Sequence, residues 1–162
     1  MNLQQLPITE LPLTGCGEVL PDWIDEMGHM NVMWYTHLFS RAVFGMFDLF
    51  GFTPEYMKAH NAGSFALEMH VRYLAEVRVG QKVTLRTRIL GRTAKRLHYM
   101  QFLIIDGSDK LSATGELVSA HVDLGIRRQT PWPDELLAKL DPLVAAHAGL
   151  AWPAPVCGTM GP

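Results

Sequence analysis

Apolar residues recur at helical spacing through one long stretch in the first third of the chain. The residues that share this face are Val32, Tyr35, Phe39, Ala42, Val43, Met46, Phe47 and Phe50. Apolar positions three and four apart lie on one side of a helix, so the spacing predicts a helix over 32–50 that stops before Gly51. Met33, Trp34 and Leu38 widen the apolar face, and we therefore expect this helix to be enclosed on several sides.

After this helix the pattern changes to alternation of apolar and polar residues, which predicts half-buried strands. The predicted strands cover 65–73, 82–89, 98–105 and 111–123. The dipeptide Asp106-Gly107 is a turn signal between the last two, so the four strands should form an antiparallel meander. The remaining expected elements are a short strand at 13–19 and small helices at 54–58 and 133–146.

An antiparallel sheet has an apolar face to cover, and the helix at 32–50 is the only predicted element long and apolar enough to cover it. The predicted fold class is therefore α+β, with a sheet of about five strands wrapped around one long central helix. The chain has 162 residues, 48% of them hydrophobic, which suits a single domain that we expect to span 1–150. Residues 151–162 are rich in proline and glycine and are predicted to be a loose tail.

Composition argues against several classes of function and location. A formal net charge of −2 does not favour a nucleic-acid-binding surface. No stretch contains the roughly 18 consecutive apolar residues that a membrane span needs, and the first residues do not resemble a signal peptide. The two cysteines, Cys16 and Cys157, lie near opposite ends of a chain too large to need a disulfide. We therefore predict a soluble, cytoplasmic protein.

The segment 25–31, Asp-Glu-Met-Gly-His-Met-Asn, carries the strongest chemical signal in the chain. It places a carboxylate, a glycine, an imidazole and an amide directly before the predicted helix. A carboxylate can act as a base or nucleophile in acyl transfer. The N–H groups at a helix N-terminus can polarise a carbonyl group and stabilise negative charge on its oxygen. The combination indicates an enzyme that acts on a carbonyl group.

The predicted architecture and the motif Asp25-x-x-Gly28-His29-Met30-Asn31 resemble the hotdog-fold acyl-CoA thioesterases, the superfamily of 4-hydroxybenzoyl-CoA thioesterase. The resemblance covers residues 19–128. A narrower resemblance is to the branch associated with carnitine breakdown, which includes betainyl-CoA thioesterases. The segments that carry it are 23–31, Leu67-Glu68-x-His70, Tyr73-Leu74-x-Glu76 and Lys95-Arg96-x-His98. The resemblance implies hydrolysis of a small acyl-CoA thioester, with betainyl-CoA as the leading candidate and coenzyme A as part of the substrate, so no separate cofactor is expected.

The resemblance also implies that Asp25 is the acidic residue of the site. It would act either as a general base on water or as a nucleophile that forms an anhydride with the acyl group. Many relatives carry an additional acid five residues before the glycine, where this chain has Trp23. Asp22 is the nearest earlier acid and is the alternative catalytic carboxylate. Considered alone, an aspartate shortly before a helix is more often a helix cap.

The other motif residues have structural interpretations beside their catalytic ones. Gly28 permits a tight turn and would let a main-chain N–H point at the thioester oxygen. His29 would orient Asp25 or contact substrate, and a structural hydrogen-bonding role is equally consistent with the sequence. Asn31 is most simply the N-cap of the helix, and only secondarily a ligand to water or to the carbonyl group.

Aromatic residues near the motif are candidates for an acyl pocket, because aromatic faces would hold a trimethylammonium group. Trp23 and Trp34 flank the motif and are the preferred pair. Tyr35 and Tyr73 are also candidates, although Tyr35 lies on the main apolar stripe and is more simply interpreted as a core residue.

Glu68 and His70 share one face of their predicted strand and would line the site. In the resembling family this strand lies along the dimer seam, so the pair would reach the Asp25 pocket of a partner subunit. A solvated strand face is the simpler alternative, especially for His70. We accordingly expect a homodimer, with a dimer of dimers left open.

Five cationic residues cluster around the turn that follows the 82–89 strand: Arg86, Arg88, Arg92, Lys95 and Arg96. Such a cluster suits the phosphates of coenzyme A, although a charged outer face is the commoner explanation. Lys95 and Arg96 belong to the resembling motif and rank first.

The histidines at 29, 37, 70, 98 and 121 fall on different predicted elements, without the paired spacing of a zinc site, so no metal is predicted. Two rival functions stay open. One is a hotdog hydratase or dehydratase, which would use a histidine with an acidic partner. The other is a non-catalytic acyl-CoA sensor, which would keep the pocket without needing the carboxylate.

Overall fold

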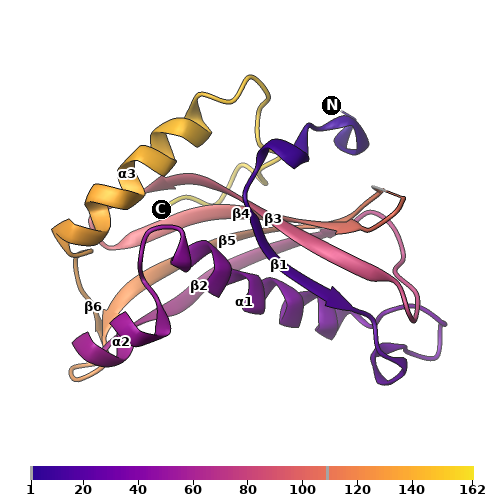
Figure 1. Cartoon of the computed structure of the whole chain (residues 1–162), viewed down its shortest axis with the longest axis horizontal. Coiled ribbons are helices and arrows are strands. Elements are labelled where there is room, and N and C mark those ends of the chain that lie inside the picture. The colour runs from indigo at the N-terminus through magenta and orange to yellow at the C-terminus, as the bar shows by residue number, and fades with distance from the viewer. Residues whose placement is uncertain (1, 109) are drawn as a thin grey trace. The chain divides into compact units, whose positions relative to one another are not determined.

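The computed structural model describes residues 2–108 and 110–162, and Figure 1 shows its elements in chain order. The helices are α1 Val32–Asp48, α2 Pro54–His60 and α3 Asp134–Ala148. The strands are β1 Leu13–Glu18, β2 Ala62–Tyr73, β3 Lys82–Arg92, β4 Arg96–Ile105, β5 Lys110–Asp123 and β6 Arg128–Gln129. Every predicted helix and strand is present, within a few residues of its expected limits. Among the described residues, no helix is both long enough and apolar enough to cross a membrane.

The strands form one sheet in the order β1-β3-β4-β5-β2, with β6 paired to β5. The α+β class is thereby confirmed. The predicted meander is right for β3, β4 and β5 but wrong for β2, which pairs with β5 rather than with β3. The free side of β3 is taken by β1, whose residues from Gly15 to Glu18 run antiparallel to Leu85 to Lys82. Alternation identifies a strand, but it does not specify a partner, and sequential strands are not always neighbours.

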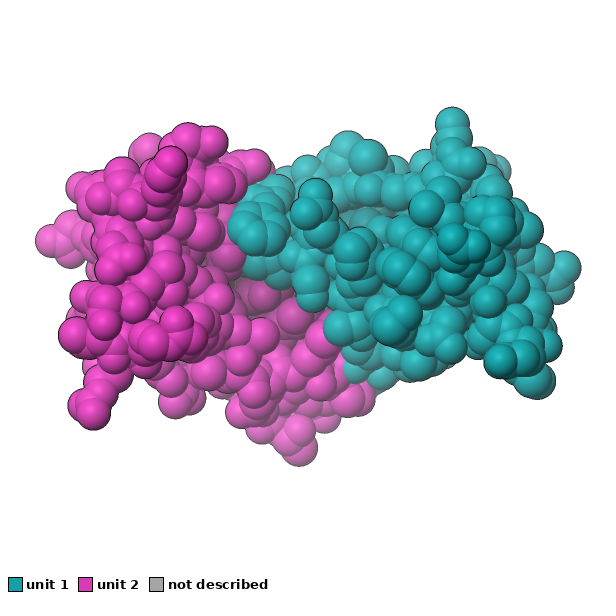
Figure 2. All heavy atoms as spheres, turned by 90° about the horizontal axis from the view of Figure 1, so that it is seen from below, with its two compact units in different colours: residues 1–46, 71–87, 101–115 teal, residues 47–70, 88–100, 116–162 magenta. Residues whose placement is uncertain are grey.

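The chain forms two compact units, coloured separately in Figure 2. Unit 1 comprises Met1–Met46, Val71–Thr87 and Gln101–Gly115, and unit 2 comprises Phe47–His70, Arg88–Met100 and Glu116–Pro162. The motif that precedes α1 therefore belongs to unit 1. Helices α2 and α3 and the C-terminal residues belong to unit 2.

In unit 1, α1 packs closely against strands that carry glycine at the contact. A Cβ atom added to Gly15 of β1 would lie 3.0 Å from the Cβ atom of Ala42. One added to Gly115 of β5 would lie 3.1 Å from the ring of Phe39. The predicted apolar face is buried here, with exposed fractions of 4% or less at Tyr35, Leu38, Phe39, Ala42 and Met46. Each large side chain buried this way contributes about 1.5–3 kcal/mol.

The expectation that α1 is enclosed on several sides is wrong. Val32 and Met33 in its first turn are 55% and 59% exposed, and Phe44 further along is 44% exposed. The helix therefore keeps an exposed face along its length, and apolar residues in the sequence do not ensure that a neighbour covers them.

The core of unit 2 contains an aromatic cluster. Phe50 and Phe52 stack with ring centroids 6.5 Å apart, and both meet Trp132 edge to face at 5.8 and 5.3 Å. The ring of His121 lies 4.8 Å from that of Trp132. All four side chains are buried, and burial lowers the pKa of His121. Each edge-to-face pair contributes about 0.5–1.5 kcal/mol beyond the stabilisation from the area that the rings bury.

The C-terminal residues, predicted as a loose tail, are instead held on unit 2. Trp152 is 8% exposed, and the guanidinium of Arg88 lies 4.5 Å from its ring centroid. Arg88 also donates to the carbonyl oxygens of Trp152 and His147, at 2.7 and 2.9 Å. Burial and the nearby Arg88 charge lower the pKa of His147, whose neutral Nδ1 accepts the Ile89 N–H at 2.9 Å. These contacts depend on tertiary packing, which composition does not reveal.

Strand β2 does not show the predicted burial of alternate residues. Its apolar residues Leu67 and Tyr73, which alternate with polar ones, are 38% and 49% exposed. Because β2 is the last strand in the sheet order, it has a neighbouring strand on one side only among the described residues. An edge strand with exposed apolar side chains is usually covered in the functional assembly.

Candidate active site

The segment from Asp25 to His29 forms a tight hairpin in unit 1. The Gly28 N–H donates to the Asp25 carbonyl at 3.0 Å, and the Asp25 N–H donates to the His29 carbonyl at 3.1 Å. Gly28 has φ +82°, the left-handed conformation that glycine adopts readily and that closes a three-residue hairpin loop. The turn interpretation of Gly28 is thus confirmed. Its N–H is engaged within the hairpin, and its role towards the thioester oxygen stays a prediction.

Asp25 and His29 form a pair at the ends of this hairpin. The Asp25 Oδ1 atom accepts the Met27 N–H at 3.0 Å, and the His29 Nδ1 atom lies 3.7 Å from the same oxygen. The exposed fractions are 17% for the Asp25 side chain and 33% for that of His29. Water can therefore reach both groups. A partly exposed carboxylate beside an imidazole can take a proton from water or attack a carbonyl carbon directly.

Asn31 is the N-cap of α1, as its position in the sequence predicts. Its Oδ1 atom accepts the Met33 N–H at 3.0 Å, and its carbonyl accepts the Trp34 N–H at 3.0 Å. Its own N–H donates to the Trp23 carbonyl at 2.9 Å, which ties the hairpin to the preceding segment. The cap engages two amides of the first turn. The hairpin therefore leads directly into the N-terminus of α1, the positive end of the helix dipole.

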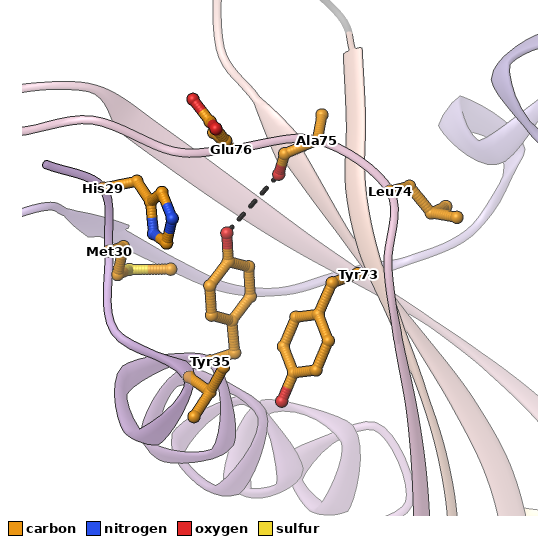
Figure 3. Close-up of a pocket in the computed structure, with 8 residues that line it drawn as sticks. His29, Met30, Tyr35, Tyr73, Leu74, Ala75 and Glu76 are labelled. Atoms are coloured by element: carbon orange, nitrogen blue, oxygen red, sulfur yellow. Dashed lines mark hydrogen bonds between the residues drawn. The ribbon is translucent and has the colours of Figure 1, made fainter. Parts of the chain in front are cut away.

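A pocket of about 380 Å³ opens beside the hairpin, and His29 forms part of its wall. Figure 3 shows the rings of Tyr35 and Tyr73 side by side in this pocket, and their centroids are 5.0 Å apart in an edge-to-face arrangement. The Tyr35 hydroxyl donates to the Ala75 carbonyl at 3.4 Å, the dashed line in Figure 3. Burial raises the pKa of Tyr35, so its phenol stays protonated and able to donate.

The charges around this pocket favour a cation over an anion. Glu76 lies at its rim and pairs with Arg78 at 3.6 Å, and both side chains are exposed. An exposed pair of this kind is weak and leaves the carboxylate available to a second cation. Within the described part of the chain, the residues that line the pocket include no lysine or arginine.

Trp23 and Trp34, the aromatic pair preferred from the sequence, stack on each other. Their ring centroids are 4.5 Å apart with an interplanar angle of 9°, and His37 meets Trp34 edge-on at 5.4 Å. Stacking occupies one face of each indole, and neither residue lines the pocket described above. Tyr35 and Tyr73 line it instead. The sequence signal for Tyr73 was its place in the Tyr73-Leu74-x-Glu76 motif, whereas Tyr35 was a pocket candidate whose position on the apolar stripe favoured the core.

Three of the five predicted phosphate-binding cations have partners within their own unit. Arg86 donates to the carbonyl oxygens of Thr9, at 3.1 Å, and of Leu11. Arg88 lies buried beneath the C-terminal residues. Arg92 forms a two-pronged salt bridge with Asp141, with both N···O distances 2.6 Å.

Lys95 and Arg96, which ranked first, are exposed at the turn between β3 and β4. The Arg96 Nε–H donates to Gln129 Oε1 at 3.4 Å, a long bond that an incoming phosphate can replace. Among the described residues, Lys95 and Arg96 are therefore free of strong competing contacts and stay candidates for binding the phosphates of coenzyme A.

Glu68 and His70 lie on β2 in unit 2. Glu68 is exposed, whereas His70 lies beside the buried carboxylate of Glu116 and the thiol of Cys157. The His98 Nε2 atom lies 2.9 Å from Glu116 Oε1. Sequence reasoning missed this group, although a single carboxylate within the apolar strand 111–122 was a usable signal. A contribution of Glu68 and His70 to a partner's site stays a prediction.

Comparisons with known proteins agree with this fold and this motif. The sequence model of the thioesterase-like superfamily matches residues 19–140. Betainyl-CoA thioesterase of Pseudomonas aeruginosa is 35% identical over 143 residues, which cover 88% of this chain and 90% of that protein.

Two solved structures are similar as well. One is from Pseudomonas putida KT2440, a protein for which thioesterase activity is proposed; it has a TM-score of 0.77 and 31% identity, covering 93% of this chain and 96% of that one. A hypothetical protein from Staphylococcus aureus, solved in complex with CoA, has a TM-score of 0.78 at 24% identity, covering 88% and 90% of the two chains.

A hotdog fold with an acid-bearing hairpin before its long helix defines a class of thioester hydrolases. The chain belongs to the thioesterase-like superfamily. It is an acyl-CoA thioesterase, as the resemblance of its motif predicted.

Proposed function

We propose that this chain hydrolyses a small cationic acyl-CoA thioester, with betainyl-CoA as the leading substrate, to the free acid and coenzyme A. The observation that carries this proposal is the pocket in which Tyr35 and Tyr73 lie beside His29, the residue paired with Asp25. The 35% identity to a betainyl-CoA thioesterase supports the same substrate.

The chemistry of the pocket suits the acyl group. A betainyl group carries a trimethylammonium one methylene from the carbonyl carbon, so the cation and the reacting carbon must bind close together. The tyrosine faces attract such a cation. The Ala75 carbonyl and the Glu76 carboxylate add negative potential, and the described lining contains no lysine or arginine that would oppose binding. Because His29 lines the pocket and its Nδ1 atom lies 3.7 Å from Asp25 Oδ1, the thioester carbonyl would bind at the His29 end of the pocket.

Asp25 would catalyse hydrolysis of the thioester by one of two routes. As a general base it removes a proton from water while the water oxygen adds to the carbonyl carbon, and the intermediate then expels CoA thiolate. As a nucleophile it attacks that carbon itself, expels the thiolate and forms an anhydride that water opens. In both routes the thiolate takes up a proton. The α1 dipole would stabilise charge on the carbonyl oxygen.

The remaining parts of the proposal concern the rest of the substrate and the assembly. Lys95 and Arg96 would contact the phosphates of coenzyme A, since both are exposed. A homodimer would cover the exposed apolar residues of edge strand β2. A cytoplasmic location would supply the acyl-CoA.

Release of free thiol from a panel of acyl-CoA esters tests the activity and its substrate. The panel contains betainyl-CoA, its neutral isostere 3,3-dimethylbutanoyl-CoA, and acetyl-, butanoyl- and crotonyl-CoA. We expect kcat/KM to be highest for betainyl-CoA. Thiol release that favours the neutral isostere would contradict the cationic substrate. Hydration of crotonyl-CoA without thiol release would favour a hydratase, and binding without turnover of any ester would favour a sensor.

Replacing Tyr73 by leucine should selectively impair the cationic substrate. Leucine keeps apolar bulk but removes the aromatic face, so kcat/KM for betainyl-CoA should fall about tenfold while that for the neutral isostere changes little. Tyr73 is 49% exposed, and the variant should fold normally. Trp34→Leu serves as the comparison. A selective loss in Trp34→Leu but not in Tyr73→Leu would move the cation site to the tryptophan stack.

A further inference from the structure

We propose that His70, Glu116 and Cys157 of unit 2 form a zinc-binding site. These residues come from β2, from β5 and from the C-terminal segment. One possible ligand atom from each, an imidazole nitrogen, a carboxylate oxygen and the thiol sulfur, lies within 4.8 Å of the other two. The thioesterase activity proposed above assigns no role to Glu116 or Cys157.

Glu116 is the buried centre of the group. Its side chain is 1% exposed, and a carboxylate in such a position needs compensating partners. His98 Nε2 lies 2.9 Å from Oε1, and the Cys157 N–H donates to Oε2 at 2.6 Å. Hydrogen bonds therefore reach both oxygens of this buried carboxylate, which lies next to two further possible metal ligands.

A thiol, an imidazole and a carboxylate together favour zinc over magnesium or calcium. Zinc binds thiolate, imidazole and carboxylate in tetrahedral sites with bonds of about 2.0–2.3 Å, which place ligand atoms about 3.3–3.6 Å apart. The three possible ligand atoms already lie within 4.8 Å of one another, so side-chain movements of about 1 Å would bring them to this spacing. Magnesium and calcium prefer sites made of oxygen ligands alone.

The surroundings of Glu116 also fit a metal ligand. Metal-binding carboxylates are commonly oriented by an outer hydrogen bond, and His98 supplies one to Oε1. Zinc binding would release the Cys157 thiol proton to solvent. The thiolate and the Glu116 carboxylate would then balance the two positive charges of the ion. Three protein ligands leave the fourth tetrahedral position for a water molecule.

Calorimetric titration of the full-length protein tests this site. Protein freed of metal with a chelator is titrated with zinc chloride, and we expect saturable binding of one ion per chain. Cys157→Ala and His70→Ala should each weaken binding at least about tenfold. With cobalt(II) in place of zinc, the wild-type protein should show a thiolate-to-cobalt charge-transfer band that Cys157→Ala lacks.

Cys16→Ala and His60→Ala are the matched controls, because both residues are exposed and lie outside the group. Their zinc affinity should equal that of the wild-type protein. Circular dichroism in chelator identifies any variant that fails to fold, and Cys157→Ser then replaces Cys157→Ala. Absence of saturable zinc binding, or wild-type affinity in both the Cys157 and His70 variants, would overturn the site. Because the readout is metal binding, neither result bears on the thioesterase proposal.

Discussion

Asp25→Asn is expected to lower kcat/KM for thioester hydrolysis about 10³-fold, the largest effect of any single substitution in the hairpin. An amide can neither take a proton from water nor attack the carbonyl carbon. The asparagine oxygen can still accept the Met27 N–H that Asp25 Oδ1 accepts at 3.0 Å. The hairpin and the thermal unfolding midpoint should therefore be preserved. Thiol release under subsaturating betainyl-CoA measures the loss.

Asp22→Asn is the matched control for this prediction. Asp22 is exposed in the 3₁₀ turn Pro21–Trp23 and is the other acid that the sequence offered for catalysis. Its amide variant should retain near-normal activity. The reverse pattern, with Asp25→Asn active and Asp22→Asn inactive, would reassign the catalytic carboxylate. Near-normal activity in both variants would contradict a catalytic role for either aspartate and would make Glu68 the candidate catalytic carboxylate.

Gly45→Ala is expected to destabilise the protein by about 3 kcal/mol or to prevent folding. Gly45 lies in α1, and in an exposed helix alanine is more stable than glycine by about 1 kcal/mol. Here a Cβ atom at position 45 would lie 2.8 Å from the carbonyl carbon of Thr14 and even closer to its oxygen. Both are main-chain atoms of β1, so the clash cannot be relieved by rotating a side chain. Chemical denaturation measures the change in the free energy of unfolding.

Ser40→Ala provides the comparison within the same helix. Ser40 is exposed, so alanine there should be neutral or slightly stabilising, in line with helix propensity. A Gly45→Ala protein as stable as the wild type would show that the main chain of Thr14 does not lie in contact with Gly45. A small gain in stability at both positions would mean that propensity alone governs this helix.

The elements of the fold could be predicted because their signals are local. Helical spacing specified α1 to within two residues of its C-terminal end, and alternation located the strands. Gly28 and Asn31 were interpreted correctly as turn and cap, since both roles depend on residues a few positions away. The motif between Asp25 and Asn31 also identified the family, because its residues are contiguous in the chain.

Features that depend on distant residues were predicted less well. The pairing of β2 with β5 was missed because alternation is the same whichever neighbour a strand has. Tyr35 was assigned to the core, and it is 4% exposed, yet its remaining surface lines the pocket with Tyr73, 38 positions further along. Helical periodicity shows that a side chain such as Tyr35 is buried, but it does not show whether part of that side chain also lines a pocket.

The C-terminal residues also show that local sequence does not predict contacts with distant residues. Their proline and glycine content suggested a loose tail, but Trp152 and Cys157 are fastened by Arg88 and Glu116 of the sheet. The absence of paired histidine spacing suggested that no metal binds, although a site can assemble from residues 46 and 41 positions apart once strands and tail come together.

The sequence by itself determined the helix, the strands, the hairpin and the acid that identifies the class, because each arises from interactions within a few residues. Only the tertiary structure decided the strand order, the tyrosine pocket, the close contact at Gly45 and the group around Glu116. These features depend on contacts between residues that are far apart in the chain. Close packing in the folded protein, rather than the local sequence pattern, decides which of those residues are in contact.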